Sequence, residues 1–174
     1  MKKKDIWISL AIIATAGLVA LVYLQRKGYL GIDAGGADAA LRLRNGWLSH
    51  VTVTSGAEPA KIGARIYRPQ HLRLSMGQNG HTWRIESRGP WADLSKLKVG
   101  NNETVKIRLG PPFLIKSRVH KQGSVVSIGY TIIGRAGEQY QNLITKDGRA
   151  VTGATINIIG EAGKVLESGK FKYG

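Results

Sequence analysis

From Leu41 onward, apolar and polar residues alternate in short segments, and this period of two constrains the fold more than any other feature of the chain. The segments are Leu41–Arg44, Val51–Thr54, His71–Met76, Trp83–Glu86, Val105–Leu109 and Val126–Ile132. Successive side chains of a strand point to opposite faces, so the alternation gives each strand one apolar and one polar face. The sequence therefore predicts an all-β domain of half-buried antiparallel strands.

Turn residues separate these segments and predict which strands pair. Asn79-Gly80 suits a two-residue type I′ hairpin, because both central residues of that turn take a positive φ. The register that follows pairs Met76 with Trp83 and Leu74 with Ile85 on the buried face, and Arg73 with Glu86 and His71 with Arg88 on the other face. Asp147-Gly148 predicts a second hairpin, and the turn at 160–163 predicts a third.

Several short strands joined by such turns are typical of a β-sandwich, and we assign this domain to residues 41–174. Gly110-Pro111-Pro112 interrupts the strand pattern, because proline cannot donate to a sheet ladder. Two interpretations of 110–112 stay open. A crossover between two sheets is favoured over a sub-domain boundary, since each half alone is small for an independent core.

The C-terminal residues carry a resemblance to known modules. The stretch 147–158, DGRAVTGATINI, resembles the DG-x-x-V-x-GA-x-V-x-I strand–turn–strand of transthyretin- and immunoglobulin-like export modules, including the carboxypeptidase-regulatory-like ones. The stretch 163–174 is similar to the closing strands of such modules in uncharacterised bacterial envelope proteins, and the run 67–112 is similar more loosely. The resemblance implies a sandwich fold and export, and it brings no shared catalytic residues.

An uncharged apolar segment, 6–24, predicts a membrane anchor in front of this domain. As a helix it would span about 28 Å, close to the hydrocarbon thickness of a bilayer. The residues that flank it are basic: Lys2, Lys3 and Lys4 before it, and Arg26 and Lys27 after it. We therefore expect a stub at 1–5, a single transmembrane helix at 6–25 and, because 31–40 is rich in Gly and Ala, a flexible tether at 26–40.

The alternative to an anchor is a signal peptide that is cleaved. A cleavable signal usually has an apolar run of about 7–15 residues followed by a small-x-small site, whereas this run is longer and leads into 23–27, YLQRK. The retained anchor is therefore favoured. The cluster Lys2–Lys4 outweighs Arg26 and Lys27, so we expect a cytoplasmic N-terminus and a periplasmic domain at the inner membrane.

The chain carries a net charge of +15, and most of the excess lies in residues 41–121, where 15 Lys and Arg face four acids. A sheet face that shows Arg73, Arg84 and Arg88 beside Trp91 is a candidate site for an anionic ligand, such as a lipid headgroup or an acidic glycan. The alternative is a solvated strand face that keeps the protein soluble, with Trp91 capping the sandwich. Nucleic acid is disfavoured as a partner, because no nucleic-acid-binding motif occurs.

Catalytic and metal-binding patterns are missing from the sequence. There is no cysteine, and His50, His71, His81 and His120 do not have the spacing of metal ligands. The chain has no GxSxG, GxGxxG or P-loop motif and no cluster of acids for proton transfer. We therefore expect that the protein is not an enzyme and that it binds no metal ion and no cofactor.

Three functions from different classes remain. The favoured hypothesis is a structural, assembly or interaction subunit of an envelope membrane complex, with the bilayer and other proteins as partners. The second is a binding module for an anionic ligand, and an enzyme is the third and least favoured. An exposed apolar patch or a long uncovered edge strand would favour the first hypothesis, whereas a concave basic groove with a bare tryptophan would favour the second.

Overall fold

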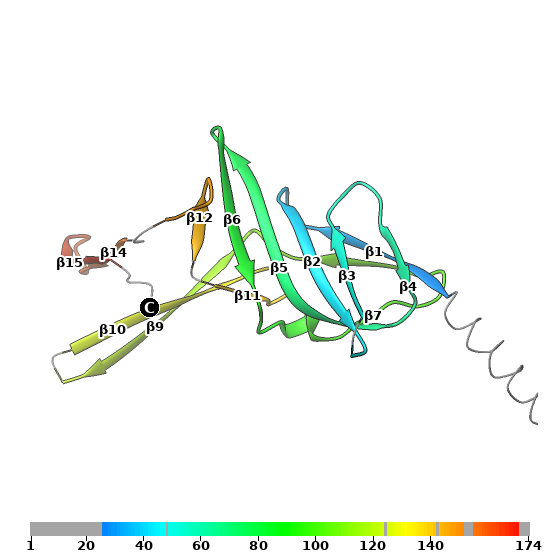
Figure 1. Ribbon diagram of the computed structural model, residues 1–174. Coiled ribbons are helices and arrows are strands. Elements are labelled where there is room, and N and C mark those ends of the chain that lie inside the picture. The colour runs from blue at the N-terminus through cyan, green and yellow to red at the C-terminus, as the bar shows by residue number, and fades with distance from the viewer. Residues whose placement is uncertain (1–25, 48, 124, 142, 152–154, 171–174) are drawn as a thin grey trace, which may run out of the picture.

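The computed structural model describes residues 26–47, 49–123, 125–141, 143–151 and 155–170, which are all-β apart from a 3-10 turn, η1 (Ala92–Ser95) (Figure 1). One sheet has the order β4-β1-β8, formed by β1 (Lys27–Asp33), β4 (Ala60–Gly63) and β8 (Thr104–Arg108). The largest sheet runs β13-β12-β6-β5-β2-β3, with β7 paired to β5. Its strands are β2 (Asp38–Asn45), β3 (Ser49–Thr54), β5 (Ile66–Gln78), β6 (His81–Ser87), β7 (Leu97–Lys98), β12 (Ile144–Lys146) and β13 (Arg149–Ala150). The prediction of an all-β fold is confirmed.

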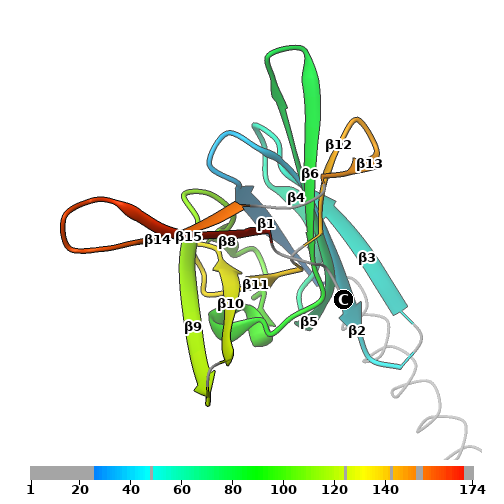
Figure 2. The same cartoon turned by 90° about the vertical axis from the view of Figure 1, so that its left-hand side faces the viewer.

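Two smaller sheets come from the C-terminal part of the chain. One has the order β11-β10-β9, with β9 (Leu114–Gln122), β10 (Val125–Ile133) and β11 (Gln139–Tyr140). The other pairs β14 (Thr155–Ile159) with β15 (Val165–Lys170), so the hairpin predicted at 160–163 is present. Figures 1 and 2 both show the β9–β10 hairpin and the β5–β6 hairpin extending from the body in different directions.

One hydrophobic cluster joins the β4-β1-β8 sheet to the largest sheet. Leu30 of β1, Leu41 of β2 and Leu72 of β5 are fully buried in it. The alternation expected of the strands is seen directly in β2, where every second residue from Ala39 to Leu43 is buried. Burial of these apolar side chains is the main contribution to the stability of this part of the chain.

The predicted β5–β6 register is confirmed: Met76 lies opposite Trp83, and Leu74 opposite Ile85. Asn79 and Gly80 take positive φ values of 52° and 75°, as a type I′ turn requires. Between β2 and β5 the register shifts after Arg42, where β5 carries an additional residue. This bulge accommodates Pro69 inside a central strand and keeps it on the buried face together with Leu72.

The predicted flexible tether at 26–40 is wrong, because this segment is part of the core. Residues Lys27–Asp33 form β1, the central strand of its sheet, and Leu30 is fully buried. The glycine-rich stretch forms the turn into β2, which begins at Asp38. Gly35 and Gly36 have positive φ values, so these glycines serve a tight turn between two strands instead of a linker.

The prediction that all strands are antiparallel also fails at one place, since β8 runs parallel to β1. Parallel pairing requires a long connection between the strands, and the whole of β2–β7 lies between them. At 110–112 the chain leaves the β4-β1-β8 sheet and enters the β11-β10-β9 sheet, so this segment connects two sheets.

The expected transmembrane helix at 6–25 and the flanking Lys2, Lys3 and Lys4 lie outside the described residues. Within the part of the chain that the structure describes, no helix is long and apolar enough to cross a bilayer.

Candidate interaction site

The β9–β10 hairpin has two chemically different faces. The register pairs Ile115 with Ile132 and Val119 with Ile128, and it places these residues on one face together with Val126 and Tyr130. The opposite face carries Lys116, Arg118 and His120. This face distribution follows from the period-two pattern of both strands. One side of the hairpin is therefore mainly apolar, with Lys121 opposite Val126 near its tip, and the other side carries the three basic residues together with the exposed Leu114 and Val125.

Much of the apolar side is not covered. Ile115 is 64% exposed, Val119 is 63% exposed and Val126 is 47% exposed. Strand β9 lies at the edge of its sheet, and all nine of its residues are exposed. An edge strand presents unpaired N–H and C=O groups to any extended chain that lies beside it.

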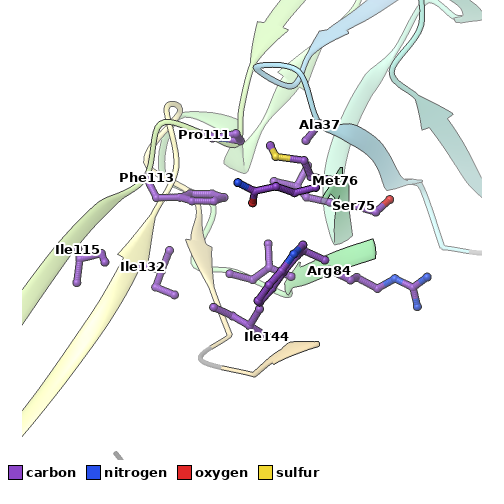
Figure 3. Close-up of a pocket in the computed structure, with 13 residues that line it drawn as sticks. Ala37, Ser75, Met76, Arg84, Pro111, Phe113, Ile115, Ile132 and Ile144 are labelled. Carbon is purple, nitrogen blue, oxygen red and sulfur yellow. The ribbon is translucent and has the colours of Figure 1, made fainter. Parts of the chain in front are cut away.

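The apolar side of the hairpin continues into a cavity of about 300 Å³ (Figure 3). Ile115 and Ile132 line it from the hairpin, and Leu74, Met76 and Ile85 line it from β5 and β6. The remaining lining residues are Ala37, Ser75, Gln78, Trp83, Arg84, Pro111, Phe113 and Ile144. We call this cavity together with the apolar side of the hairpin the apolar groove. A cavity walled by such side chains favours apolar side chains as occupants.

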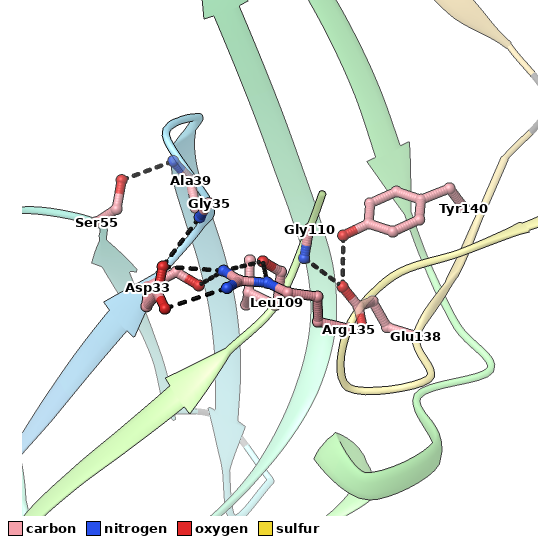
Figure 4. A network of polar contacts seen from close by, with 9 residues as sticks. All are labelled: Asp33, Gly35, Ala39, Ser55, Leu109, Gly110, Arg135, Glu138 and Tyr140. Atoms are coloured by element: carbon pink, nitrogen blue, oxygen red, sulfur yellow. Dashed lines mark hydrogen bonds and ion pairs between the residues drawn. The ribbon is translucent and has the colours of Figure 1, made fainter. Parts of the chain in front are cut away.

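A buried carboxylate holds the hairpin's sheet to the body (Figure 4). Glu138, fully buried in the turn before β11, accepts hydrogen bonds from the Gly110 N–H at 2.7 Å, the Ala136 N–H at 2.9 Å and the Tyr140 hydroxyl at 2.7 Å. Burial, and then the Glu138 carboxylate, raise the pKa of Tyr140 far above its usual value, so the phenol keeps the proton that it donates. Phe113 packs edge-on against Tyr140, with ring centroids 5.2 Å apart.

Arg135 forms a second connection in the same turn (Figure 4). Its Nη2 donates to Oδ1 of Asp33 at 2.9 Å, to the Asp33 carbonyl at 2.6 Å and to the Leu109 carbonyl at 2.9 Å. The Arg135 guanidinium lowers the pKa of the Asp33 carboxyl to about 2, and the Gly35 N–H, which donates to that carboxyl, acts in the same direction. Arg135 thus links the end of β1, the end of β8 and the turn after β10.

Two of the residues predicted to bind an anion, Arg73 and Arg84, share the outer face of the largest sheet, because Arg73 pairs with Glu86 and Arg84 pairs with Ser75. Arg73 lies on the outer face of the largest sheet, where its Nε donates to Glu86 at 2.9 Å. Partial burial acts to raise the pKa of Glu86, but the hydrogen bonds from His71 and Arg73 outweigh it and the pKa is lowered. Glu86 therefore stays ionised and offsets part of the positive charge on this face.

Arg84 and Trp91 have different surroundings. Figure 3 shows the Arg84 side chain pointing away from the apolar groove. Trp91 precedes η1 and packs, partly buried, against the core, as expected if it has the capping role. The Trp91 ring is therefore not fully exposed.

Arg88 also lines a cavity on this face, together with residues that the predicted site did not include. A cavity of about 330 Å³ is lined by Arg42, His50, Gln70, His71 and Arg88. Pairing of β2 with both β3 and β5 brings these side chains together, with Arg42 opposite both His71 and Thr52. We call this group the basic cup. The bulge in β5 moves Gln70 out of the regular alternation, so a count by twos along the sequence does not place Gln70 on the face that carries His71.

The structure shows no candidate metal site among the described residues. No group of three or more His, Cys, Asp or Glu residues lies close enough there to hold an ion. Nδ1 of His81 lies 2.7 Å from Oδ2 of Asp147, joining the β5–β6 and β12–β13 turns. His71 is engaged by Glu86 at 2.9 Å. Both histidines thus have structural partners.

No family model, curated protein or solved structure matches the chain. The likeness to transthyretin- and immunoglobulin-like modules therefore stays a prediction from the sequence.

Proposed function

We propose that this chain is an assembly or interaction subunit of an envelope membrane complex, in which a single N-terminal helix anchors an immunoglobulin- or transthyretin-like β-sandwich outside the cytoplasm. The proposal combines the uncharged apolar segment 6–24 with the apolar groove. One observation carries it: β9 is an edge strand with all nine residues exposed, and its apolar side chains continue the wall of a cavity. Exposed apolar surfaces and free sheet edges of this kind mark interaction sites.

The occupant that fits is an extended segment of a partner protein. Such a segment adds to β9 through main-chain hydrogen bonds and directs alternate side chains to the two faces of the hairpin. Apolar side chains would enter the groove beside Ile115 and Val119. Acidic side chains would face Lys116 and Arg118 on the opposite side. We therefore infer a partner strand in which apolar and acidic residues alternate.

Site-specific photocrosslinking in intact membranes tests this function. A photoreactive amino acid at position 115 or 119 is expected to capture a discrete protein partner, identified by mass spectrometry. The matched control is position 58, in the exposed loop before β4. Equal capture from 58 and 119, or capture of lipid alone from 115 and 119, would contradict the proposal.

A second candidate function, binding of an anionic ligand, is supported by the basic cup. Two arginines, two histidines and an amide converge there on one cavity. Guanidinium groups bind carboxylate and phosphate in a bidentate manner, so a phosphorylated or carboxylated ligand fits this chemistry. The candidate centres on Arg42 and Arg88 and adjoins Arg73, because His71 and Arg73 both contact Glu86.

A further inference from the structure

Trp47 differs from the other described aromatic residues in its exposure. It lies in the turn that joins β2 to β3 and is 90% exposed. By contrast, Trp83 is partly buried, and Trp91 packs against the core. A large aromatic side chain held in water is unfavourable unless another surface covers it.

The turn that carries Trp47 lies at the end of the molecule where β1 begins (Figure 1). A cavity of about 320 Å³ is lined by Lys27, the first residue of β1, together with Asn45 and Ser49, which pair at the base of this turn. The tip of the β5–β6 hairpin points away from this end in Figure 1. Trp47 is thus held close to the residue at which the sandwich begins.

Cationic side chains surround the same place. Lys27, Lys61 and Arg65 line the cavity beside the turn, and all three are exposed. Lys98 is adjacent, because Ile66 pairs with it and the Val99 N–H donates to the Arg65 carbonyl. Glu103 is the acid in this neighbourhood, next to Gly100. Positive charge therefore prevails at this end, and we call Trp47, Lys27, Lys61 and Arg65 the basal patch.

The distance to a bilayer follows from the chain itself. Gln25 and Arg26 alone separate the apolar segment 6–24 from Lys27, so Lys27 lies three residue steps beyond Leu24, at most about 11 Å along an extended chain. The interfacial layer of a bilayer is about 5–8 Å thick on each side. Because 26–40 is strand and turn instead of a tether, the sandwich cannot move far from an anchored segment 6–24.

We propose that the basal patch docks onto the anionic headgroup layer of the same membrane, with Trp47 in the interface and Lys27, Lys61 and Arg65 against lipid phosphates. Tryptophan concentrates at membrane interfaces, and each basic residue near an anionic surface contributes about 1 kcal/mol. Docking holds the sandwich in one orientation relative to the membrane. The β9–β10 hairpin, which lies away from this end in Figure 1, then stays accessible to a partner. This inference rests on the anchor in the proposed function.

Fluorescence quenching in proteoliposomes tests the docking on the full chain. The chain has no cysteine, so Ser49→Cys introduces one labelling site beside Trp47, and Thr82→Cys gives a matched exposed site near the β5–β6 tip. Both are labelled with an environment-sensitive dye in phosphatidylcholine vesicles with and without phosphatidylglycerol. We expect lipid-attached quenchers to act on the label at 49 and aqueous iodide to act on the label at 82.

Two substitutions make the result specific to the patch. Trp47→Ser, at an exposed position, is expected to reduce lipid quenching at 49 without changing the unfolding transition. Lys61→Glu with Arg65→Glu is expected to reduce the ratio of docked to undocked molecules at least fivefold for each lysine or arginine removed. Exposure of the label at 49 to iodide in a chain that still requires detergent for extraction would overturn the docking and leave the anchor intact. Recovery of the full chain in the soluble fraction would instead overturn the anchor.

Discussion

The regions before and after Gly110 differ in whether their apolar side chains are buried. Before Gly110, 18 of the 20 buried apolar side chains of the described chain form a continuous core. After Gly110, only Ile132 and Tyr140 belong to that core, and most of the exposed large apolar residues occur there. The same period-two pattern thus produces covered faces in one region and uncovered faces in the other. We infer that the first region stabilises itself, whereas the second presents surface for a partner.

The largest expected effect is a core truncation in the first region. Leu72→Ala removes a fully buried side chain and is expected to cost about 2–5 kcal/mol in the free energy of unfolding. Leu166→Ala in β15, where the side chain is 64% exposed, is expected to cost less than about 0.5 kcal/mol. Denaturant titration of both variants measures the difference. Similar losses of unfolding free energy in the two variants would contradict the inferred difference between the two regions.

The next effect concerns Glu138, which joins the two regions. Glu138→Ala leaves the Gly110 and Ala136 N–H groups and the Tyr140 hydroxyl without their acceptor, at an expected cost of about 2–4 kcal/mol. Hydrogen exchange should accelerate in β10 and β11 more than in β2. Glu161→Ala, at an exposed turn, is the control and should change nothing measurable. Uniform acceleration across β2 and β10 would show that the two regions unfold together.

A third prediction separates function from stability. Val119→Asp places a charge on the apolar side of the hairpin at a position that is 63% exposed, so unfolding should change by less than about 0.5 kcal/mol. Co-purification of the partner identified by crosslinking should fall at least tenfold. Arg118→Ser, on the basic side of the same strand, is the matched comparison and should weaken binding less. If Val119→Asp leaves co-purification unchanged, the apolar groove is not the binding surface.

The pH dependence of the Asp33–Arg135 ion pair gives a smaller effect. The pKa of Asp33 is lowered from 3.8 to about 2 in the folded protein, so the pair stabilises the fold above about pH 4 and loses this effect as the pH falls through about 2. The difference in unfolding free energy between the native chain and Asp33→Asn should therefore shrink between pH 4 and pH 2. A difference that is constant across this range would mean that the carboxylate charge does not contribute.

The smallest expected effect distinguishes the basic cup from the face predicted by sequence. If the cup binds an anion, Arg42→Glu with Arg88→Glu should lower the salt concentration at which the chain elutes from heparin. Arg73→Glu with Arg84→Glu, which changes the net charge by the same amount, should change retention less, because Glu86 already offsets part of the charge of Arg73. Equal losses from the two substitutions would assign the retention to general charge, and unchanged retention in both would remove the second candidate function.

The sequence supported the prediction of local features well. The type I′ turn at Asn79-Gly80 and the pairing of Leu74 with Ile85 follow from turn chemistry and periodicity, and both are confirmed. The segment 26–40 was mistaken for a tether because its glycines dilute the pattern of Leu30 and Ile32. The candidate site did not include Arg42 and His50, because strand pairing brings these residues of β2 and β3 beside His71 and Arg88. The apolar groove escaped prediction because alternation predicts an apolar face without predicting what covers it.

By itself, the amino-acid sequence determined that the chain forms strands, where several of them turn, and which side chains share a face. These properties depend on neighbours a few residues apart, through steric limits on φ and the two-residue repeat of a strand. The tertiary structure alone decided that β1 pairs in parallel with β8, that Glu138 is enclosed, and that the β9–β10 hairpin is left uncovered. Burial depends on which distant segments meet, and Leu30 and Ile115 differ in exposure for that reason alone.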